Sequence, residues 1–397
     1  MSRRRDGYYY GEMRSARSER TSRGVWPLLL RVLDVVWMVL TVVGAILLVM
    51  GLLSGVISPA ATPVFALAGL SYPMVYLLNV ACALWWALRL RWWFFVSAVV
   101  LVVGFGSIGR YHRLNILKND KEVTKEQSDF VVVSYNVKTF SAVEELSVRE
   151  EADSIAHWIA SRKANLVFLQ EVYFSSHMSL DCFRNSVAKY RYSFFENTDM
   201  DDPDPETGSG LMVMSSFPII DHGIACSDGD RVCSVWADLK VDRDTVRVFN
   251  LHLHSTGVAP DGEGALLAVK IVDDTLSGRK ISKIVERVSQ NFSHRATEVE
   301  QITRMIKESK YPVLVCGDMN DVPTSYTYNQ IRSDGLQDAF VERGRGAGYT
   351  FRGLRNLFRI DYILSSDSYF EVKEYDSPDL PYSDHNPVVA RLGVNAK

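Results

Sequence analysis

The chain has 397 residues, of which 47% are hydrophobic and 23% are charged, and its formal net charge is −3. This composition excludes a wholly disordered chain, a collagen-like repeat and a disulfide-dense miniprotein, and the length exceeds what one ordinary domain needs. Residues 1–127 hold 15 Lys and Arg against 7 Asp and Glu, whereas residues 128–397 hold 29 against 40. The acidic second part argues against loose attraction to long polyanions, because such binding requires cationic side chains at the phosphates.

The first part of the chain contains a long apolar stretch. Residues 35–88 include no Asp, Glu, Lys or Arg, although one helix needs only about 20 residues to cross a membrane. Pro59 and Pro63 divide this stretch, since proline ends helices and restricts the residue before it. A buried helical hairpin in a soluble domain and a cleaved signal peptide are weaker alternatives. The sequence predicts three transmembrane helices, at about 35–57, 64–88 and 92–109.

The positive residues predict how these helices are oriented. Ten arginines lie before the first helix or in the turn after the second, whereas the opposite side has five Lys and Arg just after the third helix. By the positive-inside rule the N-terminus is cytoplasmic, and the second part lies outside the cytoplasm, in the periplasm of a Gram-negative cell. We therefore expect an integral protein of the inner or plasma membrane. Its expected parts are a basic cytoplasmic tail (1–25), a membrane domain (26–109), a linker (110–127) and a second domain (128–397).

Beyond the linker, short apolar runs rich in β-branched residues alternate with amphipathic helices, which is typical of an α/β domain. Helices are predicted at 149–161 and 281–308, where apolar residues recur at helical spacing. Clustered Asp and Pro residues predict an exposed loop at 199–207. The predicted strands are 130–135, 166–170, 210–214, 232–239, 246–253, 313–316, 359–364 and 388–392.

Two of the five cysteines, Cys226 and Cys233, flank a predicted hairpin whose turn lies at 229–230. In an oxidising compartment this pair would form a disulfide. The alternative is that both are small unpaired core residues, because free cysteine is often buried. The sequence leaves the two alternatives open.

Polar side chains occur at the carboxyl ends of several predicted strands, where side chains from separate strands can meet in one cleft. Asn136 follows the first strand, Glu171 follows the second, and His252 lies near the end of the run at 246–253. Taken singly, such residues are more often strand-end turns, exposed charges or structural histidines. Their value as candidates depends on the rest of the pattern.

A sharper pattern lies in the C-terminal part of the chain. Asp318 and Asn320 follow a buried strand, and Asp384 adjoins His385 just before the last strand. Asp361 lies inside a strand, where an unpaired charge would be costly. A buried carboxylate next to the imidazole of His385 would fix its tautomer and raise its basicity. We therefore expect Asp361 to orient His385.

Seven segments carry a resemblance in the order in which they occur: SYNV, LQEV, GLMVMS, NLHL, GDMND, RIDYIL and SDHNPV. Through them, residues 128–395 resemble the endonuclease/exonuclease/phosphatase superfamily, which has the DNase I-like fold. The resemblance implies a four-layer α/β sandwich, in which helices cover two facing β-sheets and the site lies at one edge. The expected fold is this sandwich as a catalytic domain, preceded by three transmembrane helices.

The resemblance also implies a metal site. Glu171 would be the principal ligand of Mg²⁺ or Mn²⁺, with Asn136 and Asp384 nearby. Oxygen ligands without a cluster of Cys and His independently favour these hard cations over zinc.

The same resemblance implies a set of catalytic residues. Asp318 and Asn320 would position or deprotonate the attacking water and hold the phosphoryl oxygens. His252 and His385 would contact the scissile phosphate, with Asp361 orienting His385. Whether Asp318 or His385 removes the proton of the water stays open.

Two residues outside these motifs are weaker candidates. His254 could line the cleft, and Arg295 could help to neutralise phosphate. Both are more often structural or solvated residues.

The predicted function is a membrane-anchored, divalent-metal-dependent phosphoesterase that cleaves a phosphodiester or phosphomonoester by in-line attack of water. Its substrate would be a nucleic acid fragment, a lipid headgroup or a small metabolite, because a fold does not fix the substrate. The alternative is a catalytically inactive, membrane-tethered binding or scaffold domain of the same fold, which the costly cluster of acids disfavours. The lipid bilayer is the other expected partner, and the sequence indicates no obligate protein partner.

Overall fold

The computed structural model describes residues 25–113, 129–176, 178–202, 204–256, 278–333 and 335–395. The predicted tail up to residue 24 and most of the predicted linker, 114–127, lie outside the described residues.

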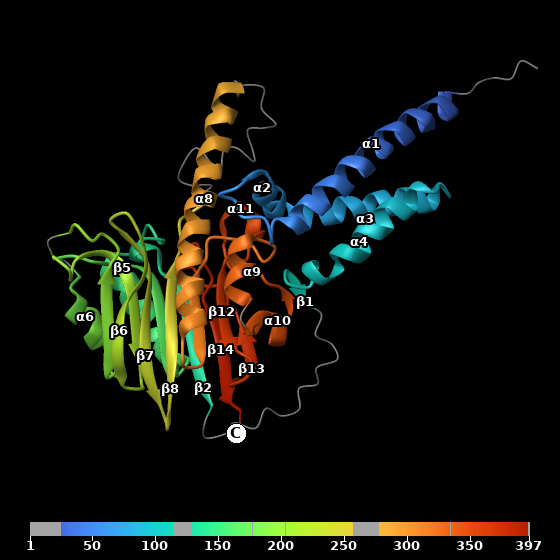
Figure 1. Ribbon diagram of the computed structural model, residues 1–397. Coiled ribbons are helices and arrows are strands. Elements are labelled where there is room, and N and C mark those ends of the chain that lie inside the picture. Colours follow the sequence, from blue (N-terminus) through green and yellow to red (C-terminus); the bar gives the residue numbers. More distant parts are fainter. Residues whose placement is uncertain are drawn as a thin grey trace, which may run out of the picture.

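Two six-stranded sheets face each other and form the centre of the larger body in Figure 1. The first sheet contains, in spatial order, β10 (Leu336–Asp338), β12 (Asp361–Ser366), β9 (Val313–Asp318), β8 (Asp244–His252), β7 (Arg231–Val241) and β6 (Ile219–Asp228). The second contains β13 (Phe370–Asp376), β14 (Val388–Val394), β2 (Phe130–Asn136), β3 (Leu166–Phe174), β5 (Gly208–Ser215) and β4 (Tyr192–Asn197). Apolar side chains from both sheets fill the space between them, which explains the nearly continuous apolar runs of the central strands.

Helices cover the outer face of each sheet. α5 (Val148–Ser161) and α6 (Leu180–Ser186) pack on the second sheet, while α8 (Gly278–Glu308) and α9 (Tyr326–Arg332) pack on the first. α5 begins with a capping box between Ser147 and Glu150. The remaining short elements are η1 (Lys138–Phe140), α10 (Ala339–Arg343), α11 (Gly353–Asn356), and the strand pair β1 (His112–Arg113) and β11 (Gly346–Ala347). The predicted four-layer α/β sandwich is confirmed.

The eight predicted strands are present, but within the two six-stranded sheets β4, β6, β10 and β13 were not expected. These four are the edge strands of the two sheets. An edge strand has a neighbour on one side only and carries fewer buried apolar residues, so its sequence signal is weaker. β6 illustrates this, because every one of its residues up to Ile224 is at least partly exposed.

The N-terminal helices are α1 (Val25–Leu53), α2 (Val64–Leu70), α3 (Tyr72–Leu88) and α4 (Trp93–Ile108). Within the described residues, only α1 is long and apolar enough by itself to cross a membrane. α2 and α3 pass the same test together, but they are bent by 70° at their junction, and α4 has only 16 residues. The three predicted transmembrane helices are therefore corrected to one, or to two if the bent pair forms one span. The bend has a local cause, since Pro73 lies in the first turn of α3.

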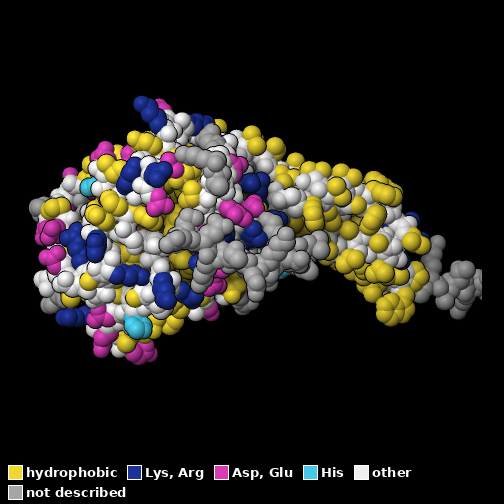
Figure 2. Space-filling model, turned by 90° about the horizontal axis from the view of Figure 1, so that it is seen from below, with side chains coloured by type: hydrophobic (Ala, Val, Ile, Leu, Met, Phe, Trp, Pro, Cys, Tyr) yellow, Lys and Arg dark blue, Asp and Glu magenta, His cyan; other side chains and the backbone are white. Residues whose placement is uncertain are grey.

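α1, α3 and α4 project from the sandwich as one arm (Figure 1). Hydrophobic side chains cover most of the arm's surface, in contrast to the mixed surface of the sandwich (Figure 2). Near the arm's outer end, Arg89 pairs with Asp34 at 2.9 Å, and Trp37 stacks on Trp85 with ring centroids 5.3 Å apart. A polar and aromatic end on an apolar body is the pattern of a membrane–water boundary.

Candidate active site

One parallel strand pair lies at the middle of each sheet, β2 with β3 and β8 with β9. The carboxyl ends of both pairs meet at one edge of the sandwich, which brings Asn136 and Asp318 together from different sheets. The Asn136 Nδ2 donates to Oε1 of Glu171 at 2.9 Å and to Oδ2 of Asp318 at 3.2 Å. The candidate site therefore spans both sheets.

Glu171 lies at an irregularity of β3. The register with β5 shifts between Leu169 and Val172, and Glu171 has a positive φ of 53°. Its Oε1 lies 3.2 Å from Nε2 of His252. Burial alone would raise the pKa of Glu171, but the hydrogen bonds and charge of His252 and the hydrogen bond from Asn136 outweigh it and lower the pKa to about 2. The carboxylate is therefore anionic at neutral pH.

Asp318 and Asn320 are held by a tight turn at the end of β9. Gly317 has a φ of 135°, and a Cβ at this position would overlap the backbone of Leu251. The backbone N–H of Asn320 donates to Oδ1 of Asp318 at 2.7 Å, and its Nδ2 donates to the Leu253 carbonyl at 3.0 Å. The turn thus fixes both polar side chains at the edge of the sheet.

Asp361 and Asp318 lie opposite each other in the antiparallel pair β12–β9. His385 contacts both, with Nδ1 2.9 Å from Oδ2 of Asp361 and Nε2 3.8 Å from Oδ2 of Asp318. Burial would lower the pKa of His385, but the two carboxylates raise it to about 10, so the ring is an imidazolium. Burial and the charge of Asp361 raise the pKa of Asp318 to about 6.

Asp384 lies beside these residues and is partly exposed. Its Oδ2 pairs with Nζ of Lys138 at 3.1 Å. Lys138 belongs to η1, directly after the strand that ends at Asn136. A cation therefore already contacts one of the carboxylates that the sequence assigns to the metal.

A cavity of about 350 Å³ opens among these side chains. Six of the eight predicted site residues line it: Glu171, His252, Asp318, Asn320, Asp384 and His385. The other two, Asn136 and Asp361, lie behind the wall and hydrogen-bond to residues that line it. The structure therefore brings the predicted residues together at one cleft.

Other residues line the cleft without having been predicted: Leu70, Arg231, Ser255, Thr256, Val322, Phe351, Phe358 and Ile360. His254, a weaker candidate, also lines it. The ring of Phe351 lies 5.1 Å from that of His385. Val322 lies two residues beyond Asn320, and this closeness to a motif could have indicated that it lines the cleft. No sequence pattern marks Leu70 or Arg231 as site residues.

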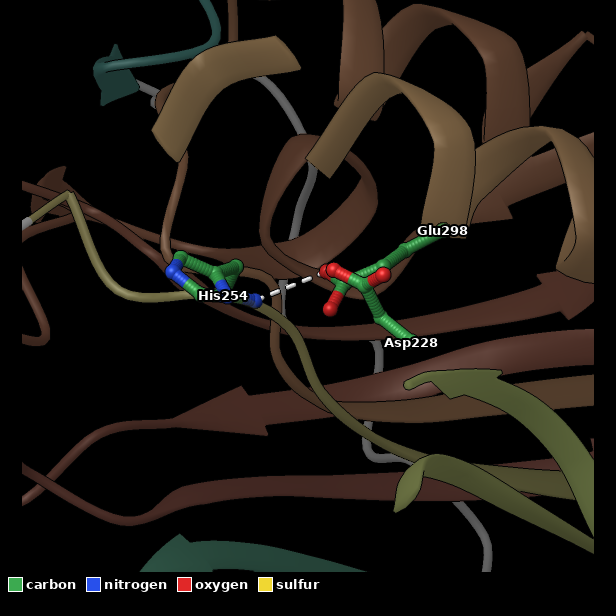
Figure 3. Close-up of side chains that lie close together, drawn as sticks. All are labelled: Asp228, His254 and Glu298. Atoms are coloured by element: carbon green, nitrogen blue, oxygen red, sulfur yellow. Dashed lines mark hydrogen bonds between the residues drawn. The ribbon is translucent and has the colours of Figure 1, made fainter. Parts of the chain in front are cut away.

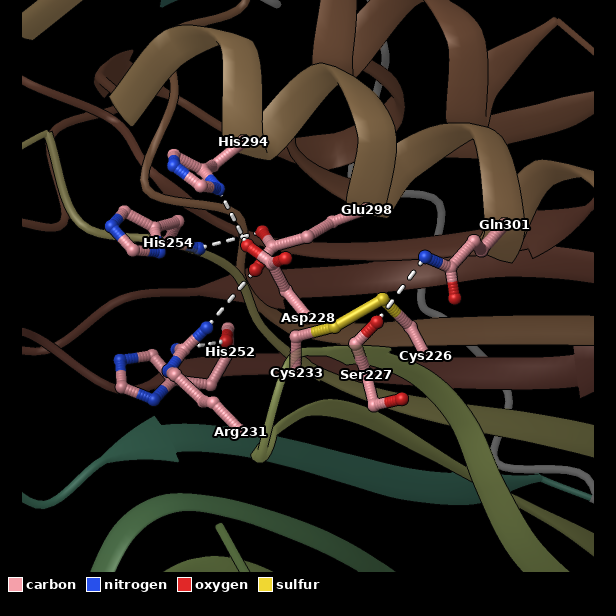
Figure 4. The surroundings of a disulfide bond; sticks show 10 residues. All are labelled: Cys226, Ser227, Asp228, Arg231, Cys233, His252, His254, His294, Glu298 and Gln301. Atoms are coloured by element: carbon pink, nitrogen blue, oxygen red, sulfur yellow. Dashed lines mark hydrogen bonds and ion pairs between the residues drawn. A yellow bond between two sulfur atoms is a disulfide. The ribbon is translucent and has the colours of Figure 1, made fainter. Parts of the chain in front are cut away.

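Arg231 reaches the cleft on a disulfide-closed hairpin. Cys226 and Cys233 are bonded across the β6–β7 hairpin (Figure 4), which decides between the two alternatives that the sequence left open. The guanidinium of Arg231 donates to the His252 carbonyl at 2.7 Å and pairs with Oε1 of Glu298 at 3.0 Å. Figure 4 shows the hairpin lying against α8, which the pair of Arg231 with Glu298 joins to it.

A second cluster of possible metal ligands, Asp228, His254 and Glu298, borders the cleft (Figure 3). One ligand atom from each lies within 4.8 Å of the others. Glu298 is fully buried, however, and its Oε2 accepts the backbone N–H of His254 at 2.8 Å while Oε1 pairs with Arg231. Since protein donors already engage both oxygens of this buried carboxylate, we assign Glu298 to positioning Arg231 and the segment at His254.

Arg295 does not line the cleft, and the expectation that it neutralises phosphate is therefore corrected. Its side chain is fully buried and pairs with Asp321 at 3.3 Å. Its Nη1 donates to the carbonyl of His254 at 2.7 Å and to Oγ1 of Thr256 at 3.2 Å. From behind the cleft wall, Arg295 therefore supports the segment that contains His254 and Thr256.

The donor atoms at the cleft suit a hard divalent cation. The carboxylates of Glu171, Asp318 and Asp384 and the amide of Asn320 line the cavity. Carboxylate and amide oxygens are the ligands that Mg²⁺ and Mn²⁺ prefer. Glu171, which is anionic and held in place by Asn136, has the properties expected of the principal ligand.

Comparison with known proteins finds matches for both parts of the chain. A model described as "Endonuclease/Exonuclease/phosphatase family" matches residues 133–385, and a model of a domain of unknown function matches residues 33–111. The crystal structure of an endonuclease/exonuclease/phosphatase from Beutenbergia cavernae has 21% sequence identity and a TM-score of 0.50, covering 68% of this chain and 72% of that one.

Two further structures have TM-scores of 0.48. The endonuclease/exonuclease/phosphatase from Bacteroides vulgatus is 19% identical and covers 68% of this chain and 100% of its own. The human Nocturnin catalytic domain with bound sulfate is 17% identical and covers 68% and 97%. No curated protein matches the chain.

Proposed function

Because this chain belongs to the endonuclease/exonuclease/phosphatase family, we propose that it is a membrane-anchored, divalent-metal-dependent phosphoesterase. It hydrolyses a phosphodiester or phosphomonoester by in-line attack of water. The observation that carries the proposal is the convergence of eight polar side chains from both sheets on one cleft. Gathering four carboxylates there is costly, and such clusters usually serve catalysis.

Glu171 and Asp384 are the residues that would hold Mg²⁺ or Mn²⁺, and Asn136 supports Glu171 through its hydrogen bond. Such a cation, when bound, counters negative charge on the phosphoryl oxygens. Asn320 and His252 line the same cavity and would donate hydrogen bonds to those oxygens. These roles agree with the resemblance that the sequence motifs carry.

Asp318 is the proton acceptor in this proposal. His385 lies between two carboxylates, and as an imidazolium it has no free lone pair, so it donates to a phosphoryl oxygen instead. The oxygen of the attacking water bonds to phosphorus while the bond from phosphorus to the leaving oxygen breaks. One proton of the water goes to Asp318, the other stays on the oxygen that is now bonded to phosphorus, and the leaving oxygen is protonated from solvent. Asp361 holds His385 in place.

The full-length protein in detergent tests this function. We expect hydrolysis of bis(p-nitrophenyl) phosphate or p-nitrophenyl phosphate with Mg²⁺ or Mn²⁺, and loss of turnover on chelation. Glu171→Gln and Asp318→Asn should each lower kcat at least about a hundredfold, whereas Glu145→Gln, which removes an exposed carboxylate, should leave it unchanged. Turnover that survives chelation, or variants equal to wild type, would refute the proposal.

The proposed location is an inner or plasma membrane, with the sandwich outside the cytoplasm. α1 is long enough to span, eight arginines lie in or before its first two turns, and a disulfide is typical of an oxidising compartment. In this topology residues 1–25 stay cytoplasmic. Alkaline phosphatase fused after Lys397 should be active, and a green fluorescent protein fused there should be dark. Fluorescence with inactive phosphatase would reverse the orientation.

A further inference from the structure

Apolar side chains line the cleft together with the acids and histidines. They are Leu70, Val322, Phe351, Phe358 and Ile360, here called the apolar wall. Four of these belong to the sandwich domain, but Leu70 is the last residue of α2. The helical part of the chain therefore contributes a side chain to the cavity that holds the candidate catalytic residues.

α2 is fixed to the sandwich by buried hydrogen bonds that centre on Thr324. The Thr324 Oγ1 donates to the carbonyl of Gly69 at 3.1 Å and is hydrogen-bonded to the hydroxyl of Tyr111 at 2.7 Å. The Thr324 carbonyl accepts a hydrogen bond from Oγ of Ser54 at 3.0 Å. Leu70 follows Gly69 directly, so its position in the cleft wall is set by these bonds.

The apolar wall continues into the arm. Val322 and Phe358, which line the cleft, pack in one cluster with Leu48 of α1 and Tyr72 of α3. Leu48 lies a few helical turns from α1 side chains that are largely exposed on the arm, such as Val35. One apolar cluster thus joins side chains of the cleft to two helices of the arm, one of which is long and apolar enough to span a membrane.

We propose that the apolar wall binds the hydrocarbon part of an amphiphilic phosphoester that reaches the cleft from the bilayer. The inference rests on the proposed phosphoesterase function and names its substrate class: a phosphate ester of an alcohol that carries an apolar chain. The phosphate faces His385 and His252, and the chain lies against Leu70 and Phe358. A small polar ester would leave this wall in contact with water, whereas a hydrocarbon chain would bury its methylenes against the wall and bind more tightly.

The test uses the full-length protein in phosphatidylcholine nanodiscs, with probes that differ only in chain length. The diester probes are methyl and hexyl p-nitrophenyl phosphate, and the monoester probes are methyl and hexyl phosphate. For the class that is hydrolysed, we expect kcat/KM to be at least tenfold higher for the hexyl ester. Equal values, with both probes hydrolysed and metal-dependent, would overturn the inference while leaving the phosphoesterase function intact. No hydrolysis of any probe would count against both.

Leu70→Ala tests the contribution of α2. We expect it to lower kcat/KM at least threefold more for the hexyl ester than for the methyl ester. Leu67→Ala is the matched control. Like Leu70, Leu67 lies on α2 and packs against the cluster that contains Val288, but it does not line the cleft. An equal loss on both esters would show a structural role for Leu70 and overturn its assignment.

A separate experiment tests whether the substrate comes from the bilayer. Dodecyl p-nitrophenyl phosphate is placed either in the nanodisc that holds the protein or in separate vesicles of the same lipid. We expect turnover at least tenfold faster in the shared bilayer. Equal rates would overturn delivery from the bilayer.

Discussion

Gly317 holds Asp318 at the edge of the sheet through a backbone conformation that other residues rarely adopt. Gly317→Ala would place a Cβ against the backbone of Leu251 in addition to straining φ. We expect the free energy of unfolding to fall by at least about 3 kcal/mol, measured by denaturant titration in detergent. Gly229→Ala is the control, since Gly229 also has a positive φ but has open space around it; its expected loss is about 1–2 kcal/mol. Equal losses would contradict the steric argument.

At the same scale, the sequence identified residues that belong to recognisable local motifs. Asp318 follows an apolar run, Asp361 interrupts one and His385 precedes one, and the structure brings the three together. Arg231 and Leu70 could not be found in this way. Arg231 lies on a hairpin and Leu70 on a helix distant in sequence, and only tertiary packing brings both to the cleft.

Among the elements, the β6–β7 hairpin depends on its disulfide. The bond joins Cys226 and Cys233, which are seven positions apart, so the chain-entropy model assigns it about 2–3 kcal/mol of stability. We expect the double variant Cys226→Ser, Cys233→Ser to lower the free energy of unfolding by about that amount. Its KM should also rise, because the hairpin carries Arg231 to the cleft. Cys182→Ser, which changes a free cysteine, should alter neither quantity.

The position of a strand in its sheet explains whether the sequence could predict it. Central strands such as β2 and β9 are buried on both faces and have continuous apolar sequences. The four edge strands mix polar and apolar residues, since one side of each contacts no other strand. The bend between α2 and α3 was missed for a related reason. Hydropathy measures how apolar a segment is and takes no account of Pro73, which starts a new helix.

For the molecule as a whole, the position of the arm depends on Thr324. Thr324→Val would leave the hydroxyl of Tyr111 buried and without this partner. We expect the free energy of unfolding to fall by about 1–3 kcal/mol and the preference for long-chain esters to weaken, as measured by denaturant titration and by the paired esters. Thr297→Val removes an exposed hydroxyl on α8 and should change neither. Unchanged stability in Thr324→Val would contradict the proposed anchoring of the arm.

The pairing of β1 with β11 has a mechanical consequence. The chain joins the sandwich by a strand pair directly after α4, which leaves little freedom for the sandwich to rotate against the arm. With α1 embedded, the opening of the cavity would stay at a fixed height and tilt above the lipid surface. Encounters would then take place in a thin layer, so the density of ester per unit area, rather than its bulk concentration, would govern the rate.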